Sequence, residues 1–163
     1  MNQKKKHQKN NEKKTKILIV DDHSIVRKGL MRLINEESDL VVCAEAENAP
    51  QALEAIEKQH IDLAIVDISL DGTNGIQLTE KIKSQRPQLP VLILTMHDES
   101  LYAKRAFQAG AEGYITKQEA AETIITAIRL ILSGKDYISD TMTQKFLKKL
   151  HSRGLTADVG DPA

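Results

Sequence analysis

Short apolar runs alternate with amphipathic stretches along most of this 163-residue chain. The runs have the length and composition of buried strands, and they cover residues 17–20, 40–44, 62–66, 91–95 and 113–116. Between and after them, apolar residues recur with helical spacing at residues 24–34, 49–59, 75–85, 99–109 and 120–132. Five strand–helix units in this order predict an α/β domain, with a parallel sheet covered by helices on both faces.

Glycine residues mark the expected ends of the later helices. Gly110 and Gly134 follow the fourth and fifth helical stretches, where a glycine commonly terminates a helix. Residues 69–74 contain Gly72 and are predicted to be a loop. Beyond Gly134 the pattern changes, with an extended segment near residues 136–139 and a sixth amphipathic helix predicted at residues 141–151.

The net charge of zero hides an uneven distribution. Residues 1–16 carry seven lysines and one glutamate, whereas the rest of the chain carries 16 basic and 22 acidic residues. Residues 1–15 have no apolar periodicity and are predicted to be a disordered basic arm, either a solvated tail or a contact for an acidic surface. We therefore divide the chain into this arm, a main domain at 16–134, and a linker at 135–163 with the sixth helix and a frayed tail.

The single cysteine, Cys43, excludes an internal disulfide and is interpreted as a small buried apolar residue. The N-terminus has no apolar region of the secretory type, and no apolar run approaches the roughly 18 residues that suggest a membrane span. These features predict a cytoplasmic protein with no membrane partner.

Carboxylates and other polar residues follow the predicted strands. Asp21 and Asp22 follow the first strand, Asp67 follows the third, Thr95 ends the fourth, and Lys117 follows the fifth. In an open α/β sheet, ligands bind beyond the carboxyl ends of the strands. If strands one, three and four are neighbours, these five side chains meet at one edge of the sheet.

Three close carboxylates repel one another unless a cation joins them. Their oxygen atoms favour a hard cation such as Mg²⁺, and no cluster of His and Cys has zinc spacing. The five histidines are interpreted mainly as surface or loop residues, with only His97 near the proposed site. A carboxylate beside Mg²⁺, an ammonium and a hydroxyl suits the acceptance of a phosphoryl group.

The ordered set Asp21-Asp22, Asp67, Thr95, Tyr114 and Lys117 resembles the receiver domain of two-component response regulators. Three segments of the sequence are similar to those of the NarL/FixJ (LuxR-type) subfamily: DDHSIVRKGL, LTMHDE and AFQAGAEGYITK. The resemblance covers about residues 16–134, which it identifies as a receiver domain. It implies a flavodoxin-like (βα)5 fold, doubly wound, with five parallel strands in the order 2-1-3-4-5.

The resemblance also implies roles for the acidic residues. Asp67 would be the phosphoacceptor, with the phosphoryl group supplied by a sensor histidine kinase. Asp22 and Asp67 would bind Mg²⁺ directly, the backbone carbonyl of Ser69 would assist, and Asp21 would act largely through water. The protein would not be an ordinary enzyme, although it would catalyse its own phosphorylation and dephosphorylation.

Three further residues have implied roles in the response to phosphorylation. Lys117 would pair with the phosphoryl group, Thr95 would be the switch hydroxyl, and Tyr114 would rotate as Thr95 moves. The resulting repacking would control dimerisation or transcriptional output. Taken singly, each residue has a simpler interpretation. Lys117 could be a solvated loop lysine, Thr95 a β-branched strand end and Tyr114 a core aromatic. Asp21 or Asp22 alone could likewise cap the first helix.

Some positions depart from the common receiver pattern. Asp71 and Gln118 stand where many receivers have proline, and Met96 stands where a small residue is frequent. A phosphorylation-independent docking module with a receiver fold is therefore a second interpretation. A third interpretation is a phosphohydrolase of the haloacid dehalogenase class. Such sites typically have a second aspartate two residues after the nucleophile, where this chain has Ser69.

The subfamily normally continues into a helix-turn-helix domain. After residue 151 this chain has too few residues for such a domain. We expect no sequence-specific DNA binding by the chain as given, and a DNA partner if a helix-turn-helix domain follows in the full protein. A homodimer is a further candidate assembly.

Overall fold

The computed structural model describes residues 13–70, 72–96, 100–139, 143–144 and 147–148. Five parallel strands form most of its main sheet: β1 (Thr15–Val20), β2 (Leu40–Ala46), β3 (Leu63–Asp67), β6 (Val91–Thr95) and β7 (Gly113–Thr116). They are ordered β2-β1-β3-β6-β7. This order confirms the predicted flavodoxin-like fold, because it is the order 2-1-3-4-5 once the strands of the main sheet are counted along the chain.

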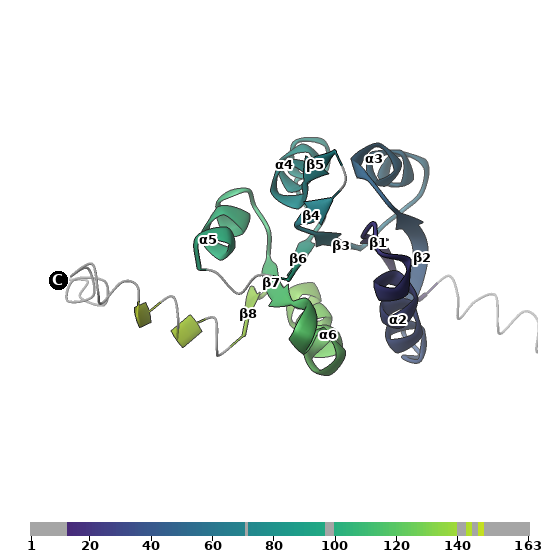
Figure 1. Ribbon diagram of the computed structural model, residues 1–163. Helices are drawn as coiled ribbons and strands as arrows, with labels where there is room; N and C mark the ends of the chain where they lie inside the picture. Colours follow the sequence, from purple (N-terminus) through teal and green to yellow (C-terminus); the bar gives the residue numbers. More distant parts are fainter. Residues whose placement is uncertain (1–12, 71, 97–99, 140–142, 145–146, 149–163) are drawn as a thin grey trace, which may run out of the picture.

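Helices cover both faces of this sheet, as Figure 1 shows. One face carries α2 (Ser24–Asn35) and α6 (Lys117–Leu132), and the other carries α3 (Ala49–Lys58), α4 (Gly75–Gln85) and α5 (Ser100–Gln108). Within the described parts of the chain, none of the helices has the length and apolarity that crossing a bilayer requires.

The alternation of side chains along the strands separates two apolar cores. In β1, Leu18 and Val20 pack on the α3–α4–α5 side, whereas Ile17 and Ile19 pack on the α2–α6 side. All four are fully buried, as are all the residues of β3 and β6. A strand buried on both faces has little room to shift, so the two cores hold the strand ends in fixed positions.

Two short features add to the predicted elements. Residues 69–74, predicted to be a loop, contain an antiparallel hairpin of β4 (Ser69–Leu70) and β5 (Thr73–Asn74). The expected extended segment contains β8 (Tyr137–Ile138), which adds a sixth strand beside β7. The predicted sixth helix falls largely outside the described residues, as do residues 1–12 of the basic arm.

The helix ends agree with the glycine signals. Gly110 and Gly134 adopt positive φ angles of 104° and 92° just after α5 and α6, as the predicted C-terminal caps require. The start of α6 was predicted three residues too late, because the helix begins at Lys117.

Two glycines provide a matched test of the packing. A Cβ added at Gly113 would lie 2.6 Å from side-chain carbons of both Ile131 and Leu92, whereas one added at Gly29 in α2 would contact nothing within 4 Å. Gly113→Ala should therefore lower the free energy of unfolding by roughly 1–3 kcal/mol through overpacking. Gly29→Ala should raise it by about 1 kcal/mol through helix propensity. Urea unfolding measures both changes, and equal stability of the two variants would contradict this packing.

Candidate acidic site at the carboxyl edge of the sheet

The carboxyl ends of neighbouring strands bring the predicted site residues to one edge of the sheet. Asp67 is the last residue of β3, and Asp21 follows the last residue of the adjacent β1. Thr95 ends β6, and Lys117 follows the end of the adjacent β7. The predicted convergence therefore rests on strand register, which places residues up to 96 positions apart in sequence at the same edge.

Lys117 connects two of the carboxylates. Its Nζ lies 3.0 Å from Oδ2 of Asp67 and 3.0 Å from Oδ2 of Asp21. The side chain is only 9% exposed, so the simpler reading of a solvated loop lysine is wrong. The side chain of Thr116 accepts the N–H of Glu119, whose own side chain accepts the N–H of Thr116, and this capping box starts α6 at Lys117.

Burial and charge act in opposite directions on the ionisable groups of this site. Burial raises the pKa of Asp67 and the nearby Asp21 carboxylate raises it further, so the pKa stays above its ordinary value despite the hydrogen bond from Lys117. Burial lowers the pKa of Lys117, but its contacts with Asp21 and Asp67 together outweigh burial and the pKa is raised. The ammonium is thus held charged, while the ionised form of Asp67 is disfavoured.

Asp21 is fully buried and held by its backbone as well as its side chain. Its Oδ1 accepts the backbone N–H of His23 at 2.8 Å, and its carbonyl oxygen accepts Nη1 of Arg27 at 2.5 Å. The ammonium of Lys117, at 3.0 Å, is the only polar partner of Oδ2 among the described residues. A buried carboxylate oxygen in that state has capacity left for a cation.

Arg27 is a site residue that the sequence interpretation missed. Its side chain is 11% exposed, and besides the Asp21 carbonyl it contacts Glu45 at 3.1 Å and Glu47 at 3.4 Å. The arginine thereby links α2, the end of β2 and the turn after β1. The only signal in the sequence was a charged residue on the apolar side of a helix, within DDHSIVRKGL.

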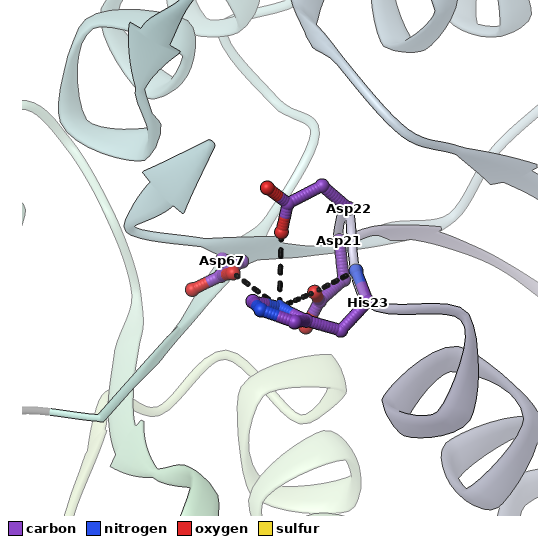
Figure 2. A group of neighbouring side chains, drawn as sticks. All are labelled: Asp21, Asp22, His23 and Asp67. Atoms are coloured by element: carbon purple, nitrogen blue, oxygen red, sulfur yellow. Dashed lines mark hydrogen bonds and ion pairs between the residues drawn. The ribbon is translucent and has the colours of Figure 1, made fainter. Parts of the chain in front are cut away.

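His23 corrects the interpretation of the histidines as surface or loop residues away from the site. Figure 2 shows its ring among the carboxylates of Asp21, Asp22 and Asp67. Nδ1 lies 3.0 Å from Asp21 Oδ1, 2.9 Å from Asp22 Oδ1 and 3.9 Å from Asp67 Oδ2. His23 is also the N-cap residue of α2, so neither Asp21 nor Asp22 has the alternative role of capping this helix.

The backbone around Asp67 is closely packed. A Cβ on Gly75, the first residue of α4, would overlap the carbonyl oxygen of Asp67, so only glycine allows this approach. Oδ1 of Asp67 accepts the backbone N–H of Ser69 at 3.2 Å. The predicted role of the Ser69 carbonyl stays a prediction.

The two predicted switch residues are both buried. Thr95 lies at the end of β6, and Tyr114 lies in β7 within the core on the α3–α4–α5 side. This position of Tyr114 agrees with the core-packing interpretation, and its rotation stays a prediction. Met96 is 61% exposed beside the site, while Asp71 and His97 lie outside the described residues.

A surface hollow lies away from this site. It has a volume of about 780 Å³ and lies where α3 and α4 end, between residues 56–62 and 85–90. This is the opposite edge of the sheet from Asp67.

Comparison with known proteins identifies the family. The family model of the response regulator receiver domain matches residues 17–129, well over half of the chain. The chain belongs to this family.

Relatives of this receiver include transcriptional regulators. It is 32% identical over 139 residues to the transcriptional regulatory protein DegU of Brevibacillus brevis, covering 85% of this chain and 59% of DegU. It is also 32% identical over 129 residues to the response regulator UvrY of Escherichia coli, covering 79% of this chain and 59% of UvrY. The receiver thus spans less than two thirds of the length of these relatives.

Solved structures agree with the fold and the subfamily. The receiver superposes on a LuxR-family two-component response regulator from Aurantimonas sp. with a TM-score of 0.80 and 36% identity, covering 83% of this chain and 97% of that one. The predicted resemblance to LuxR-type response regulators is confirmed.

Removing the ammonium from the receiver site should change its pH dependence. In Lys117→Met the pKa of Asp67 should rise further, because Lys117 is the cation that opposes its rise. When the pKa of Asp67 is higher in the folded than in the unfolded protein, protonation of Asp67 stabilises the folded state. This stabilisation is complete below the ordinary pKa of 3.8 and is lost as the pH rises through the pKa of the folded state. The variant should therefore lose on the order of 3 kcal/mol at pH 7 and less in acid.

Urea unfolding between acidic and neutral pH measures this effect, and carboxyl ¹³C NMR follows Asp67 itself. The matched control is Lys58→Met, because Lys58 pairs with Glu54 on the surface and its side chain is 71% exposed. A loss in Lys117→Met that is independent of pH would contradict the electrostatic origin of the effect.

Proposed function

We propose that this receiver accepts a phosphoryl group on Asp67 from a sensor histidine kinase, in the presence of Mg²⁺. The observation that carries the proposal is the position of Asp67, which is fully buried at a strand end with Nζ of Lys117 at 3.0 Å. Structural carboxylates seldom combine such burial with a second buried carboxylate next to them.

The residues at this edge suit a divalent cation. Oxygen atoms of Asp21, Asp22 and Asp67 converge within 4.8 Å of one another, and the buried Oδ2 of Asp21 has only the Lys117 ammonium as a polar partner among the described residues. Asp22 and Asp67 would hold Mg²⁺ directly with the Ser69 carbonyl, and Asp21 would act largely through water. When bound, Mg²⁺ would offset the negative charge of these carboxylates and of the phosphoryl oxygens.

The chain's own residues account for the transfer. An oxygen of the Asp67 carboxylate would form the new bond to phosphorus while the bond between phosphorus and the kinase imidazole breaks, and the imidazole takes up a proton. Lys117 would hold a phosphoryl oxygen by charge and hydrogen bonding, since its ammonium already lies at Asp67. The product would be an acyl phosphate, and the same site would later admit water to hydrolyse it.

The added charge would act on a two-state element. Thr95 lies at the same edge of the sheet and would move toward the phosphoryl group, while Tyr114 on the adjacent strand would repack with it. The altered face would control dimerisation or transcriptional output, with DNA as a partner if a helix-turn-helix domain belongs to the full protein. We also propose the division into arm, receiver at 16–134 and linker, and a cytoplasmic location.

Substitution of the phosphoacceptor tests this function. With acetyl phosphate and Mg²⁺, the protein should gain the mass of one phosphoryl group, and alkali should remove it. Asp67→Asn should abolish the gain, because the amide cannot form the acyl phosphate. The matched control is Asp62→Asn, at the opposite edge of the sheet, where Asp62 accepts the backbone N–H of Lys16 and an amide oxygen can do the same.

Labelling that persists in Asp67→Asn would place the phosphoacceptor elsewhere. A folded wild-type protein that is never labelled, and that does not bind beryllofluoride with Mg²⁺, would instead support the phosphorylation-independent docking module.

A further inference from the structure

We propose that Nδ1 of His23 is a metal ligand, so that the acidic site binds nitrogen-accepting divalent metals such as Ni²⁺ and Co²⁺ more tightly than carboxylates alone would. The inference deepens the proposed function, because it assumes that a divalent cation binds at this edge of the sheet. It concerns the metal preference of the site and gives a role to the His23 side chain, which makes no capping hydrogen bond at the start of α2.

Nδ1 of His23 lies among both acceptors and a donor. Nδ1 lies 3.0 Å and 2.9 Å from oxygens of Asp21 and Asp22, which accept protons, and 3.4 Å from Nζ of Lys117, which donates them. One nitrogen cannot donate to the carboxylates and also accept from the ammonium. With the proton on Nε2, Nδ1 keeps a lone pair within 4.8 Å of the carboxylate oxygens, and a metal ion would be a partner common to the nitrogen and these oxygens.

The Asp21 carboxylate does not need a proton from the ring. Oδ1 of Asp21 already accepts the backbone N–H of His23 at 2.8 Å. The His23 side chain is 59% exposed, so water can accept a proton carried on Nε2, as happens to the second nitrogen of many metal-bound histidines. The ring can therefore keep a lone pair on Nδ1 without leaving a buried group unpaired.

The spacing of Nδ1 and the Asp22 oxygen matches adjacent positions of one coordination sphere. In an octahedron with metal–ligand bonds of about 2.1 Å, adjacent ligand atoms are roughly 3.0 Å apart and opposite ones roughly 4.2 Å apart. Nδ1 lies 2.9 Å from the oxygen of Asp22 and 3.9 Å from that of Asp67. The first distance is that of adjacent ligands, and the second corresponds to an angle of roughly 135° at the metal, so the Asp67 oxygen and the ring need only a small shift to share one octahedral ion.

A nitrogen donor changes which metals the site favours. Mg²⁺ prefers oxygen ligands and gains little from imidazole, whereas affinity for nitrogen-containing sites rises toward Co²⁺ and Ni²⁺. Removing the ring should therefore separate the two kinds of metal, while removing a carboxylate should weaken both.

Calorimetric titration of the intact protein with Ni²⁺ and, separately, with Mg²⁺ tests the inference. His23→Ala should weaken Ni²⁺ binding by about tenfold or more and change Mg²⁺ binding by less than about threefold. The matched control is His60→Ala, because the His60 ring also contacts a carboxylate, Asp62 at 2.7 Å, but lies outside the cluster. Excess Mg²⁺ should displace the Ni²⁺ that depends on His23, which separates this site from Ni²⁺ bound elsewhere.

A second variant and a spectroscopic signature guard against a loss of folding. His23→Gln should show the same selective loss, and Co²⁺ bound to the wild-type protein should broaden the His23 ring resonances in NMR. Equal losses for both metals, no loss for Ni²⁺, or tighter binding of both metals would overturn the role of His23, the last by showing that the ring competes with the cation. If the wild-type protein binds neither metal, the cation in the proposed function fails as well.

Discussion

The buried ion pairs of Lys117 with Asp67 and Asp21 are the interactions on which the site depends. Both carboxylates are fully buried and the lysine side chain is 9% exposed, so neither charge is well hydrated. One ammonium stands opposite two carboxylates, and Asp22 adds a third at 30% exposure. The site therefore retains an excess of negative charge at a point where desolvation is costly, and a divalent cation would relieve it.

The fold brings these charged side chains together through the ends of its strands. Parallel strands end at one edge, and the two apolar cores on either face keep β1, β3, β6 and β7 in register. Gly75 permits the close approach of α4 to Asp67, and Arg27 ties the turn after β1 to α2 and β2. Each of these contacts fixes a backbone position, and the fixed backbone in turn holds the polar side chains at the edge close to one another.

The sequence predicted the elements that have strong periodicity. The strands ending at Asp67 and Thr95 were recognisable as apolar runs, and the side chains that follow strands had to meet once the strand order was known. The two-residue strands β4, β5 and β8 were not predicted as strands, because two residues carry no period. The start of α6 could have been read from Thr116 and Glu119, which have the spacing of a capping box.

The contributions of His23 and Arg27 were harder to predict, because they depend on where each side chain points and not on its position in the sequence. His23 follows two site aspartates in a turn, and only the conformation of that turn decides whether its ring faces them or the solvent. Arg27 lies on a helix where a long polar side chain usually reaches water, and here it reaches a backbone carbonyl instead.

The most direct test of the account is the location of a bound divalent cation. Crystals of the protein grown with Mn²⁺ and recorded where manganese scatters anomalously should show a strong peak among the carboxylates of Asp21, Asp22 and Asp67, near Nζ of Lys117. A saturating concentration that yields no peak there, or a principal peak at another part of the molecule, would contradict the account.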